Sequence, residues 1–222
     1  MSIELSGIIN NFNHLEYEKL LQNSELKIVN ILLVTNRNEN KIIELTFGNK
    51  NLEQIYFIGL CLNNYALNIS NALSHNTNLK ILDISENTLD FYFFCKIMKA
   101  IRLNNTLEEL NVNNYCFGDS YNGAKEIADM LLVNTTLRKL CIRHNKLNDD
   151  GFLKIIKALE TNFTLMELDI TYPNSITKNI IPELMKMLEI NNVITIHGID
   201  HLLPEDFFHS RKNSRKIKSA NY

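Results

Sequence analysis

The chain has 222 residues, of which 45% are hydrophobic, and its 23 Lys and Arg residues nearly balance its 25 Asp and Glu residues. This length suffices for one domain or two small ones with a buried core, and the hydrophobic fraction excludes a disordered chain. The balanced charge excludes a generally basic nucleic-acid-binding protein, and only seven glycines and three prolines disfavour a turn-rich β-sandwich. Asparagine is unusually frequent, with 33 residues by count of the sequence.

The first 51 residues predict two helices and one strand. The helices are expected over residues 14–22 and 25–36, and the strand over residues 41–47, before a cluster of turn-forming residues. The N-terminal residues show neither the basic start nor the cleavage site of a secretory signal. The longest apolar stretch, residues 28–34, is too short to cross a membrane. We therefore expect a cytoplasmic protein.

A repeat follows from residue 52 onward. Residues 82–107 align without a gap with residues 140–165, and another copy lies between them. The shared core is L-x-x-L-x-L-x-x-N, with units about 28 residues apart. Two copies match it fully, as Leu79, Leu82, Ile84 and Asn87, and as Leu137, Leu140, Ile142 and Asn145. Less regular copies begin at Leu52, Leu107 and Leu165, with Leu60, Tyr115 and Pro173 in the place of the asparagine.

Each repeated strand is followed by an amphipathic helix. Apolar residues recur at helical spacing in residues 123–134 and 150–162, and Asp149 or Asp150 is expected to cap the second of these helices. The helices end at regularly spaced asparagines, which we expect to adopt the left-handed conformation that terminates helices. These residues are Asn76, Asn104, Asn134, Asn162 and Asn191.

This pattern resembles the leucine-rich repeat of the ribonuclease-inhibitor type, over roughly residues 52–200. The resemblance implies an α/β leucine-rich-repeat solenoid, a curved right-handed horseshoe with a parallel sheet on the concave face and helices on the convex face. We expect an N-terminal cap in residues 1–51, because the terminal units of a solenoid must cover its core. Repeats with a C-terminal cap follow in residues 52–208, and a basic flexible tail in residues 209–222.

The strand positions that face away from the core form rows across the concave sheet. They carry charge in bands, which predicts either a partner-binding surface or cross-strand salt bridges. The predicted partner-binding residues are Tyr56, Asp83, Ser85, Glu86, Asn111, Asn113, Arg143, His144, Asp169 and Tyr172.

A secondary aromatic patch is predicted at Phe91, Tyr92 and Phe93, which replace the polar turn of the sister repeat. The patch would form a binding lip, or it would fold over the neighbouring unit and its insertion at residues 119–122.

Catalytic and metal chemistry are not favoured. His197 and His201, near Asp200, Glu205 and His209, lack the helical context that would hold two ligands on one face. Cys141 and His144 are expected on opposite faces of a strand, which disfavours a nucleophilic dyad. The four cysteines are expected to be reduced thiols. We expect no enzyme, no cofactor and no metal.

The expected function is non-catalytic binding of another protein on the concave face of a monomer. The resemblance leaves open inhibition or regulation of an enzyme, and the composition resembles effectors that intracellular bacteria deliver into the host cytosol. One alternative is an actin-binding scaffold, because residues 134–137 resemble the N-T-x-L helix ends of tropomodulin-like domains. Another is an adaptor recruited to anionic membranes by residues 209–222. Neither a small-molecule substrate nor a nucleic acid is expected.

Overall fold

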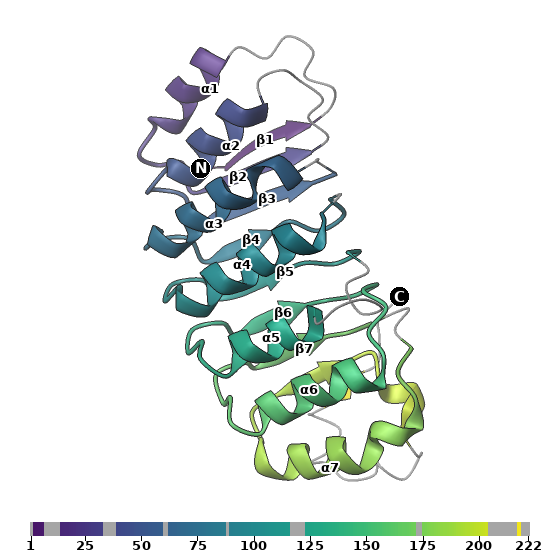
Figure 1. The fold of residues 1–222 in the computed structure, drawn as a ribbon. Coiled ribbons are helices and arrows are strands. Elements are labelled where there is room, and N and C mark those ends of the chain that lie inside the picture. The colour runs from purple at the N-terminus through teal and green to yellow at the C-terminus, as the bar shows by residue number, and fades with distance from the viewer. Residues whose placement is uncertain are drawn as a thin grey trace.

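The computed structural model describes residues 2–6, 14–32, 39–59, 62–87, 89–115, 123–171, 175–203 and 217–218. Within these residues, nine strands form one parallel sheet whose strand order follows the sequence (Figure 1). The strands are β1 Ser2–Ser6, β2 Ile28–Leu32, β3 Gln54–Ile58, β4 Ile81–Asp83, β5 Glu109–Asn111, β6 Lys139–Cys141, β7 Glu167–Asp169, β8 Thr195–His197 and β9 Ile217–Lys218.

The helices connect successive strands and all lie on one side of the sheet (Figure 1). They are α1 His14–Leu21, α2 Glu39–Gly48, α3 Ala66–His75, α4 Phe91–Leu103, α5 Gly123–Leu131, α6 Asp149–Leu159 and α7 Ile181–Ile190. Three short 3-10 turns occupy Asn63–Tyr65, Lys178–Ile180 and Asp200–Leu202. None of the helices in the described ranges is long and apolar enough to cross a membrane.

The second apolar residue of each predicted strand lies in the core. Leu82, Leu110, Leu140 and Leu168 pair in register across β4 to β7, and each is buried. Their neighbours in the strands point to the opposite, open side of the sheet, because side chains alternate along a strand. The predicted repeat strands and their two faces are confirmed.

The N-terminal region differs from the prediction. Residues 28–32 form a strand where a helix was expected over residues 25–36, and α2 covers the expected strand at residues 41–47. Val29 and Ile31 are buried in the sheet, while Ile43 and Phe47, spaced by one helical turn, are buried beneath α2. A short β-branched run fits either element by periodicity alone.

The two ends of the chain continue the sheet. Residues 2–48 supply two further β–α units. The strands β2 and β3 pair with each other across the boundary predicted at residue 51, so the sheet is continuous there. In the predicted flexible tail, Ile217–Lys218 form β9 beside β8. The other residues of 209–222 lie outside the described part of the chain.

The helix-ending asparagines bind backbone groups of two adjacent repeats. Asn134 is typical: its Nδ2 donates to the carbonyls of Ile101 (2.8 Å) and Asn104 (3.0 Å) in the preceding repeat. Its Oδ1 accepts from the backbone N–H groups of Thr136 (2.9 Å) and Leu137 (2.7 Å) in its own turn. The backbone of the equivalent Asn104 is extended (φ −71°, ψ 133°), so the expected left-handed conformation is wrong. The side chain, rather than the backbone, explains the asparagine.

We call this row the asparagine ladder. Two asparagines of the predicted N-terminal cap extend the row. Asn49 donates in the same way to the carbonyl of Leu21 (2.7 Å), and Asn23 accepts from the N–H of Glu25 (2.9 Å). The full ladder comprises Asn23, Asn49, Asn76, Asn104, Asn134, Asn162 and Asn191. Since the last carbonyls of a helix have no partner within it, the ladder residues that donate satisfy the end of the helix in the preceding repeat; these are Asn49, Asn104, Asn134, Asn162 and Asn191.

Asparagines also hold the strand exits. Asn87 Nδ2 donates to the carbonyl of Phe57 (2.7 Å), and Asn145 Nδ2 donates to the carbonyl of Val112 (2.8 Å). The predicted caps of α6 are wrong, because Asn148 caps this helix by accepting from the N–H of Gly151 (2.9 Å). Asp149 instead accepts from the Thr177 hydroxyl of the next repeat (2.6 Å).

Replacing a ladder asparagine should weaken the junction between repeats. We expect Asn134→Ala to lower the free energy of unfolding by about 3 kcal/mol, because buried carbonyl and N–H groups lose their partners. The control is Asn105, an exposed residue next to the ladder residue Asn104, and Asn105→Ala should lower the free energy of unfolding by less than about 0.5 kcal/mol. Urea unfolding followed by circular dichroism measures both. Equal losses in the two variants would contradict the role given to the ladder.

Candidate protein-binding face

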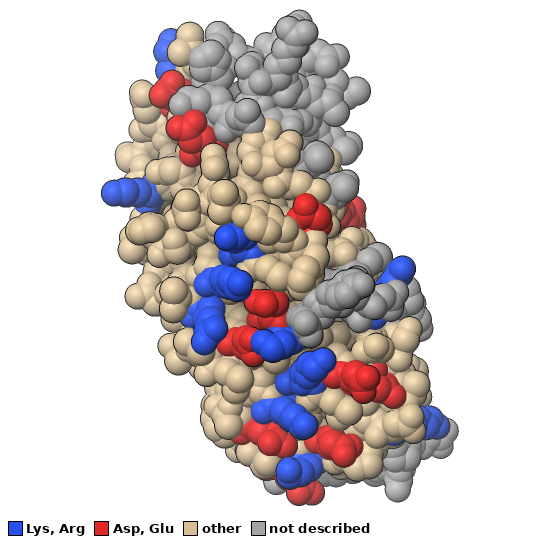
Figure 2. All heavy atoms as spheres, viewed as in Figure 1, with Lys and Arg blue, Asp and Glu red and all other residues tan. Residues whose placement is uncertain are grey.

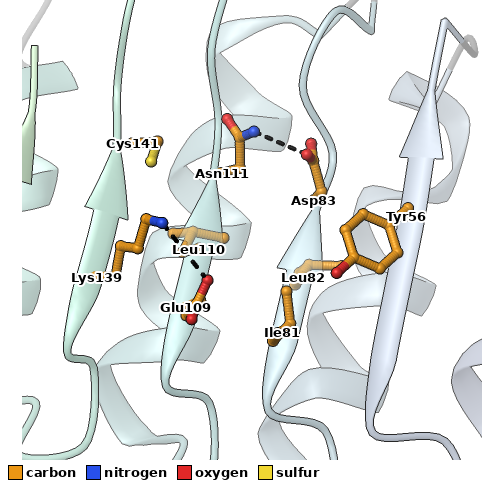
Figure 3. A pocket seen from close by; sticks show the side chains of 9 residues that line it. All are labelled: Tyr56, Ile81, Leu82, Asp83, Glu109, Leu110, Asn111, Lys139 and Cys141. Atoms are coloured by element: carbon orange, nitrogen blue, oxygen red, sulfur yellow. Dashed lines mark hydrogen bonds and ion pairs between the residues drawn. The ribbon is translucent and has the colours of Figure 1, made fainter. Parts of the chain in front are cut away.

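The predicted concave row exists. Tyr56, Asp83, Asn111, Cys141 and Asp169 pair directly with one another across β3 to β7. Their side chains project from the side of the sheet opposite the helices, as Figure 3 shows for the first four. The parallel register therefore brings residues about 28 positions apart into one line.

The first part of this row surrounds a hollow of about 200 Å³ (Figure 3). Asn111 Nδ2 donates to Asp83 Oδ2 (2.7 Å), and the Tyr56 hydroxyl donates to Gln54 Oε1 (3.1 Å). The hollow is lined by Tyr56, Ile81, Leu82, Asp83, Glu109, Leu110, Asn111, Lys139 and Cys141.

Asp83 is fixed from a second side. Its Oδ1 accepts from the backbone N–H (2.8 Å) and the hydroxyl (2.6 Å) of Ser85. Ser85 is buried as a result, so this predicted binding residue orients Asp83 and offers a partner little surface.

An ion pair occupies the β6–β7 end of the row. Arg143 donates through Nε to Asp169 Oδ2 (2.8 Å) and also through Nη2 to the same oxygen. Asp169 is only 3% exposed, and its Oδ1 accepts from the backbone N–H of Thr171 (3.0 Å). Burial alone would raise the pKa of Asp169, but the hydrogen bonds from Arg143 and Thr171 outweigh it and lower the pKa. Asp169 therefore anchors Arg143, whose side chain is half exposed.

The predicted cross-strand salt bridges are present. They are Lys27–Glu53 (3.1 Å), Lys80–Glu108 (2.9 Å) and Lys139–Glu109 (4.0 Å), and His197 Nε2 also lies 3.2 Å from Glu167 Oε1. Most of their side chains are well exposed, so each pair contributes little to stability and can be exchanged for contacts with a partner. On the helix side, acidic and basic residues are intermixed over α5 to α7, whereas the charged residues of α4 are all basic (Figure 2).

Three concave-rim residues have a left-handed backbone. Glu86 (φ 56°), Asn114 (φ 67°) and His144 (φ 54°) follow the strands at the same repeat position, where the earlier repeat has Gly59 (φ 73°). All three are exposed. This conformation favours glycine, so the side chains of Glu86 and His144 come at a cost in backbone strain. Asn113 is half-buried, and its Oδ1 accepts from the N–H of Arg143 (2.7 Å). The last predicted residue, Tyr172, lies outside the described residues.

The aromatic patch is only partly as predicted. Residues 91–93 form the first turn of α4, capped by Asp90, and do not form a non-helical turn. Phe93 is fully buried in the core, while Phe91 is 39% and Tyr92 53% exposed. Lys96 Nζ lies 5.1 Å from the centre of the Tyr92 ring. The exposed patch thus consists of Phe91 and Tyr92, and the predicted insertion at residues 119–122 lies outside the described part.

The described residues offer no group of three His, Cys, Asp or Glu side chains that could hold a metal ion. Glu205 and His209 lie outside them. Burial raises the pKa of Cys141 to about 11, with a smaller contribution from Asp169, so this thiol is protonated at neutral pH. A protonated thiol is a poor nucleophile.

The Arg143–Asp169 pair should make stability depend on pH. Because the native pKa of Asp169 lies below its unfolded value of about 3.9, the ionised carboxylate stabilises the native state above that pH. This contribution is lost as the pH falls through the native pKa. We expect Asp169→Asn to cost about 2 kcal/mol at pH 7 and progressively less below about pH 4.

Thermal unfolding of both proteins between neutral and acidic pH measures this difference. Glu189→Gln, at an exposed position in α7, is the control and should show no such convergence with the native protein. A constant difference between Asp169→Asn and the native protein would contradict the assignment.

Comparisons with known proteins agree with this architecture. The family described as Leucine Rich repeat matches residues 75–90 and 133–155. No curated protein sequence matches the chain, whereas 73 solved chains match its structure. One is leiomodin-1 actin-binding site 2, with TM-score 0.55 and 19% identity over 67% of this chain and 86% of that one. Another is the yeast Rad7–Elc1 complex, with TM-score 0.46 and 14% identity over 94% of this chain and 64% of that one. The repeat matches and the continuous parallel sheet make this chain an α/β leucine-rich-repeat solenoid.

Proposed function

We propose that the chain is a non-catalytic module that binds another protein on its concave face. The observation that carries the proposal is the exposed left-handed row. Glu86 and His144 keep long side chains where glycine would relieve strain, and they border the open side of the sheet. Strained backbone positions cluster at sites that contact ligands, and solenoid proteins bind partners on their concave surfaces.

The neighbouring contacts support the same proposal. Asp83, held by Asn111 and Ser85, and Arg143, held by Asp169, have fixed positions before any partner arrives. Such preorganisation reduces the entropy lost on binding. Tyrosine and arginine, represented by Tyr56 and Arg143, are residue types that often dominate binding energy. Leucine-rich repeat domains are typically protein-interaction modules, generally without catalytic activity.

We further propose that the repeats are of the ribonuclease-inhibitor type, which a helix after each of the strands β1 to β7 and a spacing of about 28 residues support. A partner that is an enzyme would then be inhibited when the concave face covers its active site. The asparagine-rich composition is the basis for proposing a bacterial effector, or a regulator of one.

A charge exchange on the concave face tests the proposal. Lys139 and Glu167 are direct neighbours in β6 and β7, so Lys139→Glu with Glu167→Lys inverts the local charge pattern at constant net charge. We expect this variant, cross-linked in the cells that produce the chain, to lose at least about tenfold of its captured partner. Quantitative mass spectrometry of the captured proteins measures the loss.

The matched control exchanges a pair on the helix side. Lys186 Nζ lies 3.5 Å from Glu160 Oε1, and Lys186→Glu with Glu160→Lys also keeps the net charge. This variant should capture the partner like the native chain. Loss of capture in the helix-side variant alone would overturn the proposed face.

Actin is a second candidate partner, favoured by the shared fold of leiomodin-1 actin-binding site 2. The predicted N-T-x-L resemblance at residues 134–137 has a structural explanation, because Asn134 belongs to the asparagine ladder. The motif therefore supports the fold more than it supports actin binding.

Sedimentation with filamentous actin tests this candidate. If actin is the partner, the native chain pellets with filaments and the concave charge exchange leaves it in the supernatant. A native chain that stays in the supernatant, and that leaves the polymerisation rate of pyrene-labelled actin unchanged, excludes actin and leaves the concave face for another protein.

A further inference from the structure

The hollow between β3 and β6 has an uncompensated negative charge. No described Lys or Arg side chain forms an ion pair with Asp83, which accepts hydrogen bonds from the neutral side chains of Ser85 and Asn111 and from a backbone N–H. Glu109 has only a long contact with Lys139 (4.0 Å between Oε2 and Nζ). Two carboxylates and one ammonium group therefore line the hollow, which gives it a formal charge of −2 + 1 = −1.

Tyr56 forms an aromatic wall on the β3 side of the hollow, beside Asp83, while Glu109 projects from β5 on the other side of β4 (Figure 3). Burial raises the pKa of its hydroxyl, and the nearby Glu109 and Asp83 raise it further, against the effect of Lys139. The two carboxylates therefore act on the Tyr56 hydroxyl more strongly than Lys139 does. An aromatic face and a carboxylate together attract a planar cation more strongly than either does alone.

We propose that the hollow is the site for one arginine side chain of the partner protein. The guanidinium group would stack on the Tyr56 ring and donate hydrogen bonds to the free acceptor positions of Asp83 and Glu109. This inference rests on the proposed function, because it names the chemistry of the partner that docks on the concave face.

The size of the hollow fits this occupant. A volume of about 200 Å³ equals roughly six or seven waters at ~30 Å³ each, which is the scale of one long side chain. Arg143, further along the face, is already paired with Asp169 and so does not compensate the charge at Asp83. The uncompensated negative charge and the free volume of the hollow therefore lie at the same place, beside Tyr56, Asp83 and Glu109.

Peptide titration of the full chain, followed by NMR, tests the proposal. The probe is acetyl-Gly-Arg-Gly-amide, and the matched control peptide carries citrulline, which has the shape of arginine without its charge. We expect the arginine peptide to shift the side-chain amide of Asn111 and the ring of Tyr56, with millimolar affinity. The citrulline peptide should bind at least about fivefold more weakly, because the charge-assisted hydrogen bonds are lost.

Three variants locate the effect. Asp83→Asn keeps the shape of the side chain and should weaken arginine-peptide binding roughly tenfold, while Lys139→Ala should strengthen it about twofold. Asp129→Asn, in the Lys125–Asp129 pair of α5, is the control and should leave binding unchanged. Amide spectra of each variant show whether the fold is retained, and Glu109→Gln replaces Asp83→Asn if the latter is unfolded.

Equal binding of the citrulline peptide, equal binding by Asp83→Asn, or shifts located away from the hollow would overturn the proposal. A lysine peptide that binds as well as the arginine peptide would overturn the preference for a guanidinium group. If peptide binding fails while the concave charge exchange still abolishes partner capture, the proposed function stands and only the arginine site is wrong. If both fail, both proposals are wrong.

Discussion

The fold depends on one requirement: the last carbonyl groups of each helix need donors that the helix itself does not contain. The asparagine of the next repeat supplies them and, through its oxygen, also fixes the turn into its own strand. Asn104 shows both roles, donating to the carbonyl of Leu73 and accepting from the N–H of Leu107. The burial of leucines holds the sheet and the helices together, but the hydrophobic effect has no preferred direction. The hydrogen bonds of the asparagine side chain do have a preferred geometry, so they set the spacing and alignment of one repeat against the next.

The positions of the side chains on the concave face depend on this alignment. Because each repeat is fixed to the one before it, residues such as Asp83 and Asn111 meet at hydrogen-bond distance although 28 positions separate them. Their neighbours Ser85 and Asn113 serve as internal supports for the row. The proposed binding surface is therefore a consequence of the repeat spacing.

Periodicity predicts the sheet, its inward leucines and the concave rows, because a repeated pattern averages out local ambiguity. It fails at residues 25–47, where single apolar runs fit either helix or strand. Asn23 and Asn49 could have corrected this, since they continue the spacing of the later helix ends. The burial of Phe93 and the pairing of Arg143 with Asp169 depend on contacts between repeats, which the pattern of one repeat does not contain.

The asparagine ladder also makes each joint between repeats depend on an intact side-chain amide. Deamidation would convert the amide of Asn162, which donates to the carbonyls of Leu131 and Asn134, into a carboxylate without a donor. A buried negative charge would then face two carbonyl oxygens, an arrangement that is costly inside a protein. Damage at one atom would loosen the joint between two repeats while leaving every residue of the concave face chemically intact.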